Sequence, residues 1–212
     1  MMYVLIMGRG IWVVRHGERR DSVDPQWPDV ADRVHDPPLT ELGRWAGWRT
    51  GKYFAQAGFD FDHIFASPYL RTVETATEIC QEMNSTAVIE PGLGEHLNPE
   101  WFDSKPTRLS IDTLTEQFGP IQQPKEPHVI PEFPEDHQSA MARVAKTTRQ
   151  ILDSTTGDVL IIGHGLTVGG VVHGVDALVE AVDAPLCGIT HCSDDSGQWV
   201  LQKSGYTEHL NE

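Results

Sequence analysis

The chain has 212 residues, of which 39% are hydrophobic, 22% charged and 8% aromatic. This composition is typical of a single globular domain and excludes disorder or a fibrous repeat over the whole chain. Its 31 acidic residues outnumber the 16 basic ones and give a formal net charge of -15, which repels nucleic-acid backbones and anionic lipid, so we expect neither nucleic acid nor a membrane as a partner.

The N-terminal stretch is apolar but lacks the features of a signal peptide or a membrane span. No basic region precedes it, and Gly8, Arg9 and Gly10 interrupt it well short of the roughly 18 apolar residues that a span requires. The three cysteines have no CxxC spacing, and their odd number argues against a disulfide framework. We therefore expect a soluble protein of the cytoplasm.

The first predicted strand covers residues 11–14, whose apolar and β-branched side chains are typical of a strand buried on both faces. It ends directly at the run Arg15-His16-Gly17-Glu18-Arg19. Because ligands bind at the carboxyl ends of strands in open α/β sheets, this run is a candidate binding site. A helix is predicted next, with Thr40 as its N-cap and Gly58 at its end.

Two further strands and the helix between them are predicted, in chain order, at residues 63–66, 69–83 and 87–89. Arg71 lies at the start of the helix, where free backbone N–H groups attract anions. Glu95 follows the second of the two strands. An arginine and a carboxylate thus join the candidates at the strand ends.

The segment over residues 97–136 is predicted to be irregular. Prolines recur at every third or fourth position from Pro120 to Pro134, which excludes a regular helix or a central strand there. The residues that follow it predict too few strands for a sheet of their own. We therefore interpret this segment as a proline-rich lid or side wall of one domain over residues 1–212.

The last part of the chain predicts a helix and the two strands of a hairpin, at residues 141–152, 189–190 and 199–202. Between them, residues 159–162 form another apolar strand that ends at Gly163 and His164. Strands and helices alternate, so we expect an α/β sandwich with a mainly parallel sheet. If the two apolar strands are neighbours, His164 lies within a few ångströms of His16.

The polar residues at these strand ends suit phosphoryl transfer. Arg15 and Arg71 can hold phosphoryl oxygens with their planar forks. His16 is the better placed nucleophile, and nearby arginines keep its ring neutral. His164 would donate to the transferring oxygens, while Glu95 would protonate the leaving group and then activate water. We expect a hydrolysis that proceeds through a phosphohistidine and needs no metal or other cofactor.

Three separated motifs, at residues 15–18, 67–71 and 163–165, resemble the histidine phosphatase, or phosphoglycerate mutase-like, superfamily. The similarity covers nearly the whole chain. Arg19 makes the first motif most similar to the phosphatase domains of the suppressor of T-cell receptor signalling (TULA) proteins and to the ecdysteroid-phosphate phosphatases. The resemblance implies a three-layer α/β/α sandwich on a mixed sheet of about six strands. It also implies a nucleophilic His16, the proton donor Glu95, and phosphate contacts from Arg15, Arg19, Arg71 and His164.

The region after the first motif contains Trp27 but lacks the Trp-Asn pair of the mutases. A phosphatase is therefore the implied activity, with a phosphoglycerate mutase-type phosphotransferase or a catalytically idle phospholigand-binding relative as alternatives. A metallohydrolase with His16, Glu95 and His164 as ligands is a third alternative, which the neighbouring arginine cations make unfavourable. The expected partner is a phosphorylated small molecule or phosphoprotein, and a homodimer is compatible with the sequence.

Two of these roles have competing interpretations. Glu18 and Glu90 are alternative proton donors, and Glu18 is otherwise expected to pair with an arginine. Arg71 could instead form a surface ion pair with Glu74 or Glu78, which follow it at helical spacing.

Aromatic side chains in the loops are expected to contact the leaving group. We expect Trp27, Trp101 or Phe102 to flank it and to favour aromatic or bulky phosphate esters, phosphotyrosine included. The remaining histidines show no ligand spacing and are expected to be structural or exposed, namely His35, His63, His128, His137, His173, His191 and His209.

Overall fold

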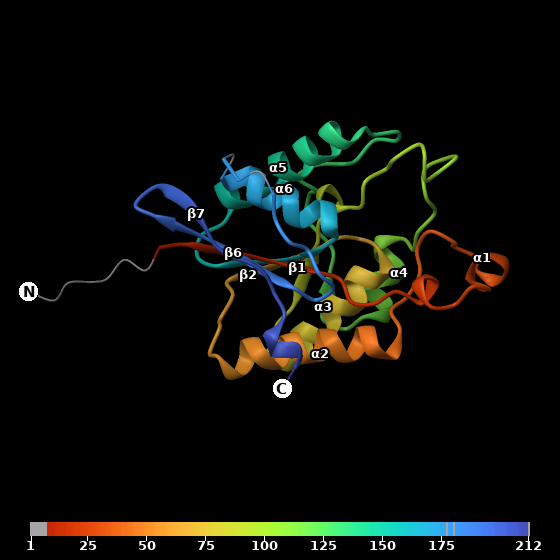
Figure 1. The fold of residues 1–212 in the computed structure, drawn as a ribbon, viewed down its shortest axis with the longest axis horizontal. Coiled ribbons are helices and arrows are strands. Elements are labelled where there is room, and N and C mark those ends of the chain that lie inside the picture. The colour runs from red at the N-terminus through yellow and green to blue at the C-terminus, as the bar shows by residue number, and fades with distance from the viewer. Residues whose placement is uncertain (1–7, 177, 180, 212) are drawn as a thin grey trace, which may run out of the picture.

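A mixed β-sheet runs through the middle of the molecule, with helices on both of its faces (Figure 1). The structure is a computed structural model that describes residues 8–176, 178–179 and 181–211. The start of the apolar N-terminal stretch, up to residue 7, lies outside these described residues. Across the sheet, the seven strands follow the order β4-β3-β2-β5-β1-β6-β7.

Five of the strands are parallel to one another: β4 (Ile121–Gln122), β3 (Ala87–Ile89), β2 (His63–Ala66), β5 (Val159–Gly163) and β1 (Gly10–Arg15). The central pair, β1 and β5, places Arg15 opposite Gly163, so both strands end at the same level. Their side chains are almost all buried, as expected for strands that are apolar on both faces.

The predicted C-terminal hairpin is confirmed and is longer than predicted. β6 (Ile189–Asp195) pairs antiparallel with β1, and β7 (Gln198–Tyr206) pairs antiparallel with β6. Ser196 and Gly197 form the turn between them with φ of 59° and 89°. The sheet therefore has seven strands where about six were expected, and the additional one is the short edge strand β4.

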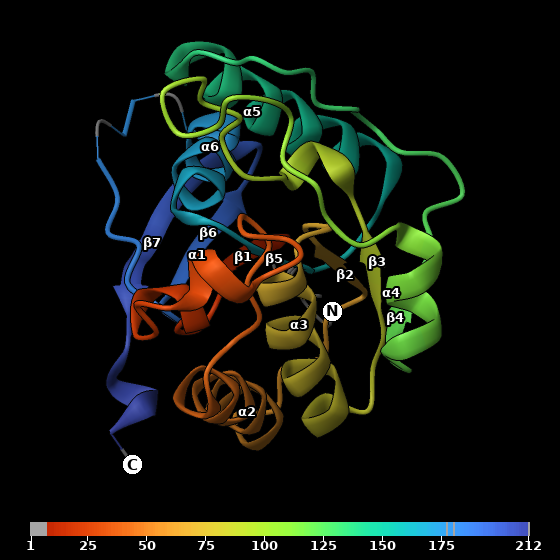
Figure 2. The ribbon, with the colours of Figure 1, turned by 90° about the vertical axis from the view of Figure 1, so that its right-hand side faces the viewer.

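Helices cover both faces of the sheet, which confirms the three-layer α/β/α sandwich (Figure 2). α2 (Glu41–Gln56) and α3 (Leu70–Met83) pack on one face, and α5 (His137–Ser154) and α6 (Gly165–Val175) pack on the other. Each face has its own apolar core, with Phe54 and Val73 in one and Val144 and Val171 in the other.

The predicted ends of α2 agree with the structure. The Thr40 hydroxyl accepts a hydrogen bond from the Gly43 N–H at 3.0 Å, which caps the first turn. Gly58 follows the helix with φ of 76°, a left-handed conformation that favours glycine.

α6 is a helix that the sequence pattern did not predict. It is rich in glycine and has no polar face, so it lacks the amphipathic stripe by which helices are recognised. Gly170 and Gly174 serve close packing on α5. A Cβ atom at Gly170 would lie 2.5 Å from Cβ of Val144, so the two helix backbones approach more closely than larger residues allow.

The segment over residues 97–136 is less irregular than expected. It contains α4 (Ile111–Gln117), whose N-cap Ser110 accepts a hydrogen bond from the Thr113 N–H, and the edge strand β4. The remaining short elements are η1 (Arg20–Ser22), α1 (Trp27–Val30), η2 (Pro91–Leu93) and η3 (Glu208–Leu210). None of the described helices combines the length and the apolar character that crossing a bilayer demands. The three cysteines are free and buried.

Candidate active site

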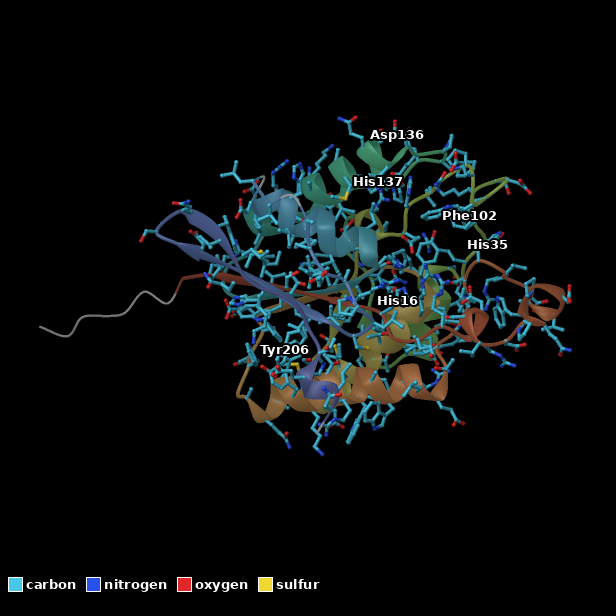
Figure 3. The ribbon with its side chains drawn as sticks, viewed as in Figure 1. His16, His35, Phe102, Asp136, His137 and Tyr206 are labelled. Carbon is cyan, nitrogen blue, oxygen red and sulfur yellow. The ribbon has the colours of Figure 1, made fainter. Side chains whose placement is uncertain are left out.

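Two histidine rings lie next to each other at the carboxyl ends of β1 and β5. His16 directly follows β1 and His164 directly follows β5, and their ring centroids are 5.5 Å apart. Both are buried, with 2% and 0% of their surface exposed. The parallel pairing of the two strands brings them together, and His16 lies between the two helix layers (Figure 3).

The environment of His16 leaves one ring nitrogen free to react. Its Nδ1 lies 2.8 Å from the Gly17 carbonyl oxygen and donates a hydrogen bond to it, so the lone pair is on Nε2. Burial lowers the pKa of His16 well below its usual value, and the charges of Arg71 and His164 lower this pKa further. A neutral imidazole held in this way is a competent nucleophile.

The turn at Gly17 fixes the position of His16. A Cβ atom at Gly17 would lie 2.4 Å from the carbonyl oxygen of Gly43 in α2. Any larger residue would force the turn and the helix apart. The Gly17 N–H also donates to the Thr75 hydroxyl of α3 at 3.1 Å, so the chain after β1 is held against both helices of this layer.

Arg71 places its guanidinium group beside both His164 and Glu95. Its Nη2 lies 3.2 Å from Glu95 Oε2 and 3.2 Å from His164 Nδ1, and the group lies over the ring of Tyr69. Arg71 is 2% exposed, yet its Nε and Nη1 have no hydrogen-bond partner among the described residues. Buried donors without acceptors are costly, and a tetrahedral oxyanion would supply the acceptors.

The alternative interpretation of Arg71, a surface ion pair with Glu74 or Glu78, is wrong. Its side chain is buried, and Glu74 pairs instead with Arg44 at 2.5 Å. Glu74 Oε2 also accepts a hydrogen bond from the Leu39 N–H. Arg71 is therefore directed into the candidate site rather than along the surface of α3.

Arg15 and Arg19 extend the positive charge beyond Arg71. Arg15 donates from Nη1 to the Ala184 carbonyl oxygen at 2.7 Å, and its buried Nε has no partner among the described residues. Arg19 contacts Asp21 at 3.0 Å and is about one-third exposed in its side chain. Both arginines line a large cavity next to the histidine pair.

Glu95 and His164 form a second contact, with Oε2 3.3 Å from Nδ1. Burial alone would raise the pKa of Glu95, but His164, Arg71 and the His96 N–H outweigh burial and hold this pKa well below its usual range. Burial, helped by Arg71, lowers the pKa of His164 to about 4, although Glu95 opposes this shift. At neutral pH, His164 is therefore neutral and Glu95 ionised.

The two alternative proton donors lie elsewhere. The Glu18 carboxylate accepts a hydrogen bond from the Thr40 hydroxyl at 2.8 Å and forms no ion pair with an arginine within the described part of the chain, so its expected pairing is wrong. Glu90 accepts from the backbone N–H groups of Gly92 and His128 and so anchors two loops. Of the three candidate carboxylates, Glu95 is the one beside the histidine pair.

Two cavities open next to these groups. The larger, of about 700 Å³, is lined by the charged residues Arg15, Arg19 and Glu95, by three histidines, and by apolar residues that include Trp101, Met141, Leu166, Val172 and Val182. The smaller, of about 230 Å³, is lined by residues that include Arg71, Glu95, His35, Trp101 and Phe102. Since His164 contacts Arg71 and Glu95, it lies directly behind the cavity walls, with the ring of His16 next to it.

Aromatic and histidine side chains line these cavities in a way that only partly matches the prediction. Trp101 lines both cavities and Phe102 the smaller one, where it packs against His35 (Figure 3). Trp27 is not among the lining residues, and its Nε1 donates to the Val34 carbonyl oxygen. Sequence reasoning missed the lining residues His35, His96, His137 and His173. No motif surrounds these histidines in the sequence, so their place at the cavities could not be found from it.

His16, Glu95 and His164 offer ligand atoms within 4.8 Å of one another, a spacing that a metal ion could use. Arg71 makes this use unfavourable. Its guanidinium lies 3.2 Å from atoms of both Glu95 and His164, so a divalent cation would meet a fixed positive charge at contact distance. The same arrangement attracts an anion.

Comparisons with known proteins agree with the three motifs. The sequence model of the histidine phosphatase superfamily (branch 1) matches residues 11–207. An ecdysteroid-phosphate phosphatase of Drosophila melanogaster is 25% identical over 91% of this chain and 31% of its own length. The human ubiquitin-associated and SH3 domain-containing protein A is 29% identical over 91% of this chain and 36% of its own. The chain thus spans about a third of the length of these curated relatives.

A solved structure supports the fold. The ecdysone phosphate phosphatase of Bombyx mori in complex with tungstate superposes with a TM-score of 0.77, covering 94% of this chain and 93% of that one at 22% sequence identity. At this identity the likeness establishes the phosphoglycerate mutase-like fold, whereas the assignment of the site depends on the distances and burial of this chain's own residues.

Proposed function

The chain belongs to branch 1 of the histidine phosphatase superfamily, and on this premise we propose that it is a phosphomonoesterase that forms a phosphohistidine on His16. One observation carries the proposal. A buried, neutral imidazole with a free Nε2 lies beside His164, which contacts a guanidinium group whose buried Nε and Nη1 have no partner among the described residues. A nucleophile beside an oxyanion site is what phosphoryl transfer requires.

In the first half-reaction, Arg15, Arg19, Arg71 and His164 hold the phosphoryl oxygens. His16 Nε2 attacks phosphorus, so a P–N bond forms while the bond to the leaving oxygen breaks. That oxygen takes a proton from Glu95 and departs as the alcohol or phenol. Because Glu95 is ionised in the free protein, it has to gain this proton when the substrate binds. The phosphoryl charge next to it raises its pKa and makes that transfer favourable.

In the second half-reaction, the Glu95 carboxylate takes a proton from a water molecule. The water oxygen attacks phosphorus, the P–N bond breaks, and its electron pair returns to Nε2 of His16. Inorganic phosphate then takes up the proton from Glu95 and leaves, which returns the carboxylate to its ionised form. Since arginines and His164 supply the charge stabilisation, this sequence of steps uses no metal ion.

We also propose that the larger cavity accepts the leaving group and favours aromatic or bulky esters, phosphotyrosine included. Its volume of about 700 Å³ and the apolar residues in its wall support this, because pockets of this size bury most of a ligand of comparable size. Trp101 and Phe102, from the segment over residues 97–136, border the cavities. In this proposal that segment is a side wall of one domain rather than a separate unit.

The experiment is to mix the protein with a labelled aryl phosphate and quench it during turnover. We expect a phosphoprotein that is stable in alkali and labile in acid, absent from His16→Ala, together with release of phosphate. An intact ester that binds without turnover would instead support the phospholigand-binding alternative. Transfer of the label to a phosphoglycerate in place of water would support the mutase alternative. Loss of activity on chelation, restored by zinc, would support the metallohydrolase.

A further inference from the structure

A buried ion pair outside the two cavities is linked to the loop on which Glu95 lies. Arg143 of α5 and Glu135, which precedes α5, form a bidentate pair, with Nε to Oε1 at 2.6 Å and Nη2 to Oε2 at 2.8 Å. The two residues are 7% and 8% exposed, and neither lines the two cavities. A buried pair of charges is costly to desolvate, so its remaining contacts indicate why it is there.

Arg143 uses its remaining donors on the backbone of the Glu95 loop. Nη1 donates to the carbonyl oxygens of Gly92 at 2.8 Å and Gly94 at 3.1 Å. Nη2 donates to the carbonyl oxygen of Glu95 itself at 3.1 Å. One side chain thus holds three carbonyl groups of the loop through its planar guanidinium group, which has five N–H donors.

Glu135 holds the other side of the same loop. Its N–H donates to the Leu97 carbonyl oxygen at 2.9 Å, and its carboxylate accepts from the Leu97 N–H at 3.4 Å. Its carbonyl oxygen lies 3.0 Å from Nε2 of His96. The loop has no helix or strand from Gly94 to Asn98, so its position depends on contacts of this kind.

We propose that Arg143 and Glu135 are positioning residues that hold the Glu95 carboxylate where it exchanges a proton with the leaving group. They touch the main chain of the loop and not the reacting atoms. Proton transfer demands placement within a fraction of an ångström, so an unanchored loop would impair this step first. The proposal rests on the proposed function, in which Glu95 is the proton donor.

The test is the dependence of rate on the leaving group. We compare the rates of Arg143→Met, Glu135→Gln and wild type on a series of phosphate esters. The series begins with aryl phosphates of strongly acidic phenols, continues with those of weakly acidic phenols and ends with an alkyl phosphate. The phenoxide of a strongly acidic phenol leaves without a proton, whereas an alkoxide needs a proton in order to leave. We expect kcat/KM, which reports only the half-reaction that releases the leaving group, to fall about 10- to 100-fold for the alkyl ester and less than about threefold for the most acidic phenol. Arg143→Lys, which keeps the charge but not the fork, should fall in between.

A double-mutant cycle with Glu95→Gln identifies the route of the effect. If Arg143 acts through Glu95, Arg143→Met adds no further dependence on the leaving group in the Glu95→Gln background. The matched control is Arg149→Met, another arginine of α5, which donates to the Gly174 carbonyl oxygen away from the site. The rates of this control should depend on the leaving group as those of wild type do. Should Arg143→Met fail to fold by circular dichroism, Glu135→Gln retains the size of the side chain and carries the test.

The outcomes separate the two proposals. An equal loss on every ester, or an unchanged rate on all of them, would overturn the positioning role while leaving the phosphatase intact. If the effects of Arg143→Met and Glu95→Gln multiply in the double mutant, the positioning role is likewise overturned and the phosphatase is left intact. A wild-type protein that hydrolyses none of the esters would overturn the proposed function, and the positioning role with it.

Discussion

The protonation states of three buried side chains govern the proposed chemistry at the scale of single residues. Burial and nearby positive charge lower the pKa of His16 and of His164, so both rings are neutral near pH 7. Glu95 is ionised, because His164 and Arg71 overcome the effect of its burial on its pKa. The free protein therefore holds the nucleophile ready, while the proton for the leaving group has to arrive with the substrate.

This requirement predicts an acidic optimum for kcat/KM with an ester whose leaving group needs a proton, such as the phosphate of a weakly acidic phenol. The second proton of a phosphate monoester dissociates near pH 6, so above that value fewer substrate molecules bring the proton that Glu95 needs. On the acid side, activity falls as the buried histidines take up protons, with a pKa of about 4 for His164. We expect the maximum between about pH 4 and pH 6 from initial rates in constant-ionic-strength buffers. A rate that climbs from pH 6 to pH 8 would contradict a proton delivered by the substrate.

The main site residues could be predicted because of where they stand along the chain. His16, His164, Arg71 and Glu95 each follow a strand that the apolar pattern predicts, and parallel strands gather such residues at one edge. The cavity walls could not be predicted in the same way. Residues such as His137, from the first turn of α5, have no motif around them, and their place depends on how the helices pack.

At the scale of elements, close packing of α6 on α5 depends on where its glycines fall. Gly170 faces Val144, where a Cβ atom would lie 2.5 Å from Cβ of the valine. Gly169, its neighbour in sequence, faces the larger cavity, and a Cβ atom there would lie 3.4 Å from Cε of Met141. One glycine is thus required by packing, and the other leaves room in the cavity.

Alanine substitutions should distinguish these two roles. We expect Gly170→Ala to destabilise the protein by about 1–3 kcal/mol, because the added methyl group has to push α5 and α6 apart. Gly169→Ala is expected to be neutral or to stabilise by up to about 1 kcal/mol, because alanine favours the helix and meets only a flexible methionine. Denaturant unfolding of the two variants and wild type measures both values. If Gly170→Ala and Gly169→Ala lower the free energy of unfolding equally, the closer approach of α5 at Gly170 does not matter for stability.

A larger residue at Gly169 should narrow the cavity. We expect Gly169→Leu to lower kcat/KM at least about tenfold for bulky, multi-ring aryl phosphates, because its side chain occupies space that the leaving group needs. Small alkyl phosphates should be hydrolysed at nearly the wild-type rate. Gly119→Leu is the control, since nothing lies within 4 Å of a Cβ atom there. A uniform loss on small and large esters would contradict this use of the cavity.

The predicted elements were those with a clear local pattern. β1, β2, β3 and β5 have short apolar runs that are evident in the sequence, and the two hairpin strands flank an evident turn, whereas β4 is two residues long and lies in a proline-rich segment. β4 exists because it pairs with β3, which no local signal reveals. α6 escaped prediction for a related reason, since its glycines lower helix propensity and are compensated only by contact with α5.

At the scale of the whole molecule, buried neutral histidines connect folding to pH. His164 and His209 each have a pKa of about 4, and burial is the main cause in both. His209 lies in the C-terminal turn η3, with its Nε2 3.0 Å from the Thr50 hydroxyl of α2. Once the chain unfolds, these rings regain an ordinary pKa near 6.5 and bind protons.

We therefore expect the free energy of unfolding to be at its full value above about pH 6.5 and to fall as the pH drops toward about 4. The unfolded state binds more protons over this range, so acid favours it, by about 3 kcal/mol from His164 alone. Urea unfolding at pH 7.5 and at pH 4.5 measures the difference. His209→Gln should reduce the dependence on pH, and an unchanged slope in that variant would contradict its contribution.

The three cysteines have a consequence for inhibition. Each is buried, and burial raises the pKa of Cys80 to about 11 and of Cys187 and Cys192 to about 12. Almost no thiolate is therefore present at physiological pH, and thiolate is the form that alkylating agents and peroxide attack. Iodoacetamide, which inactivates enzymes with a cysteine nucleophile, should leave turnover by this protein unaffected.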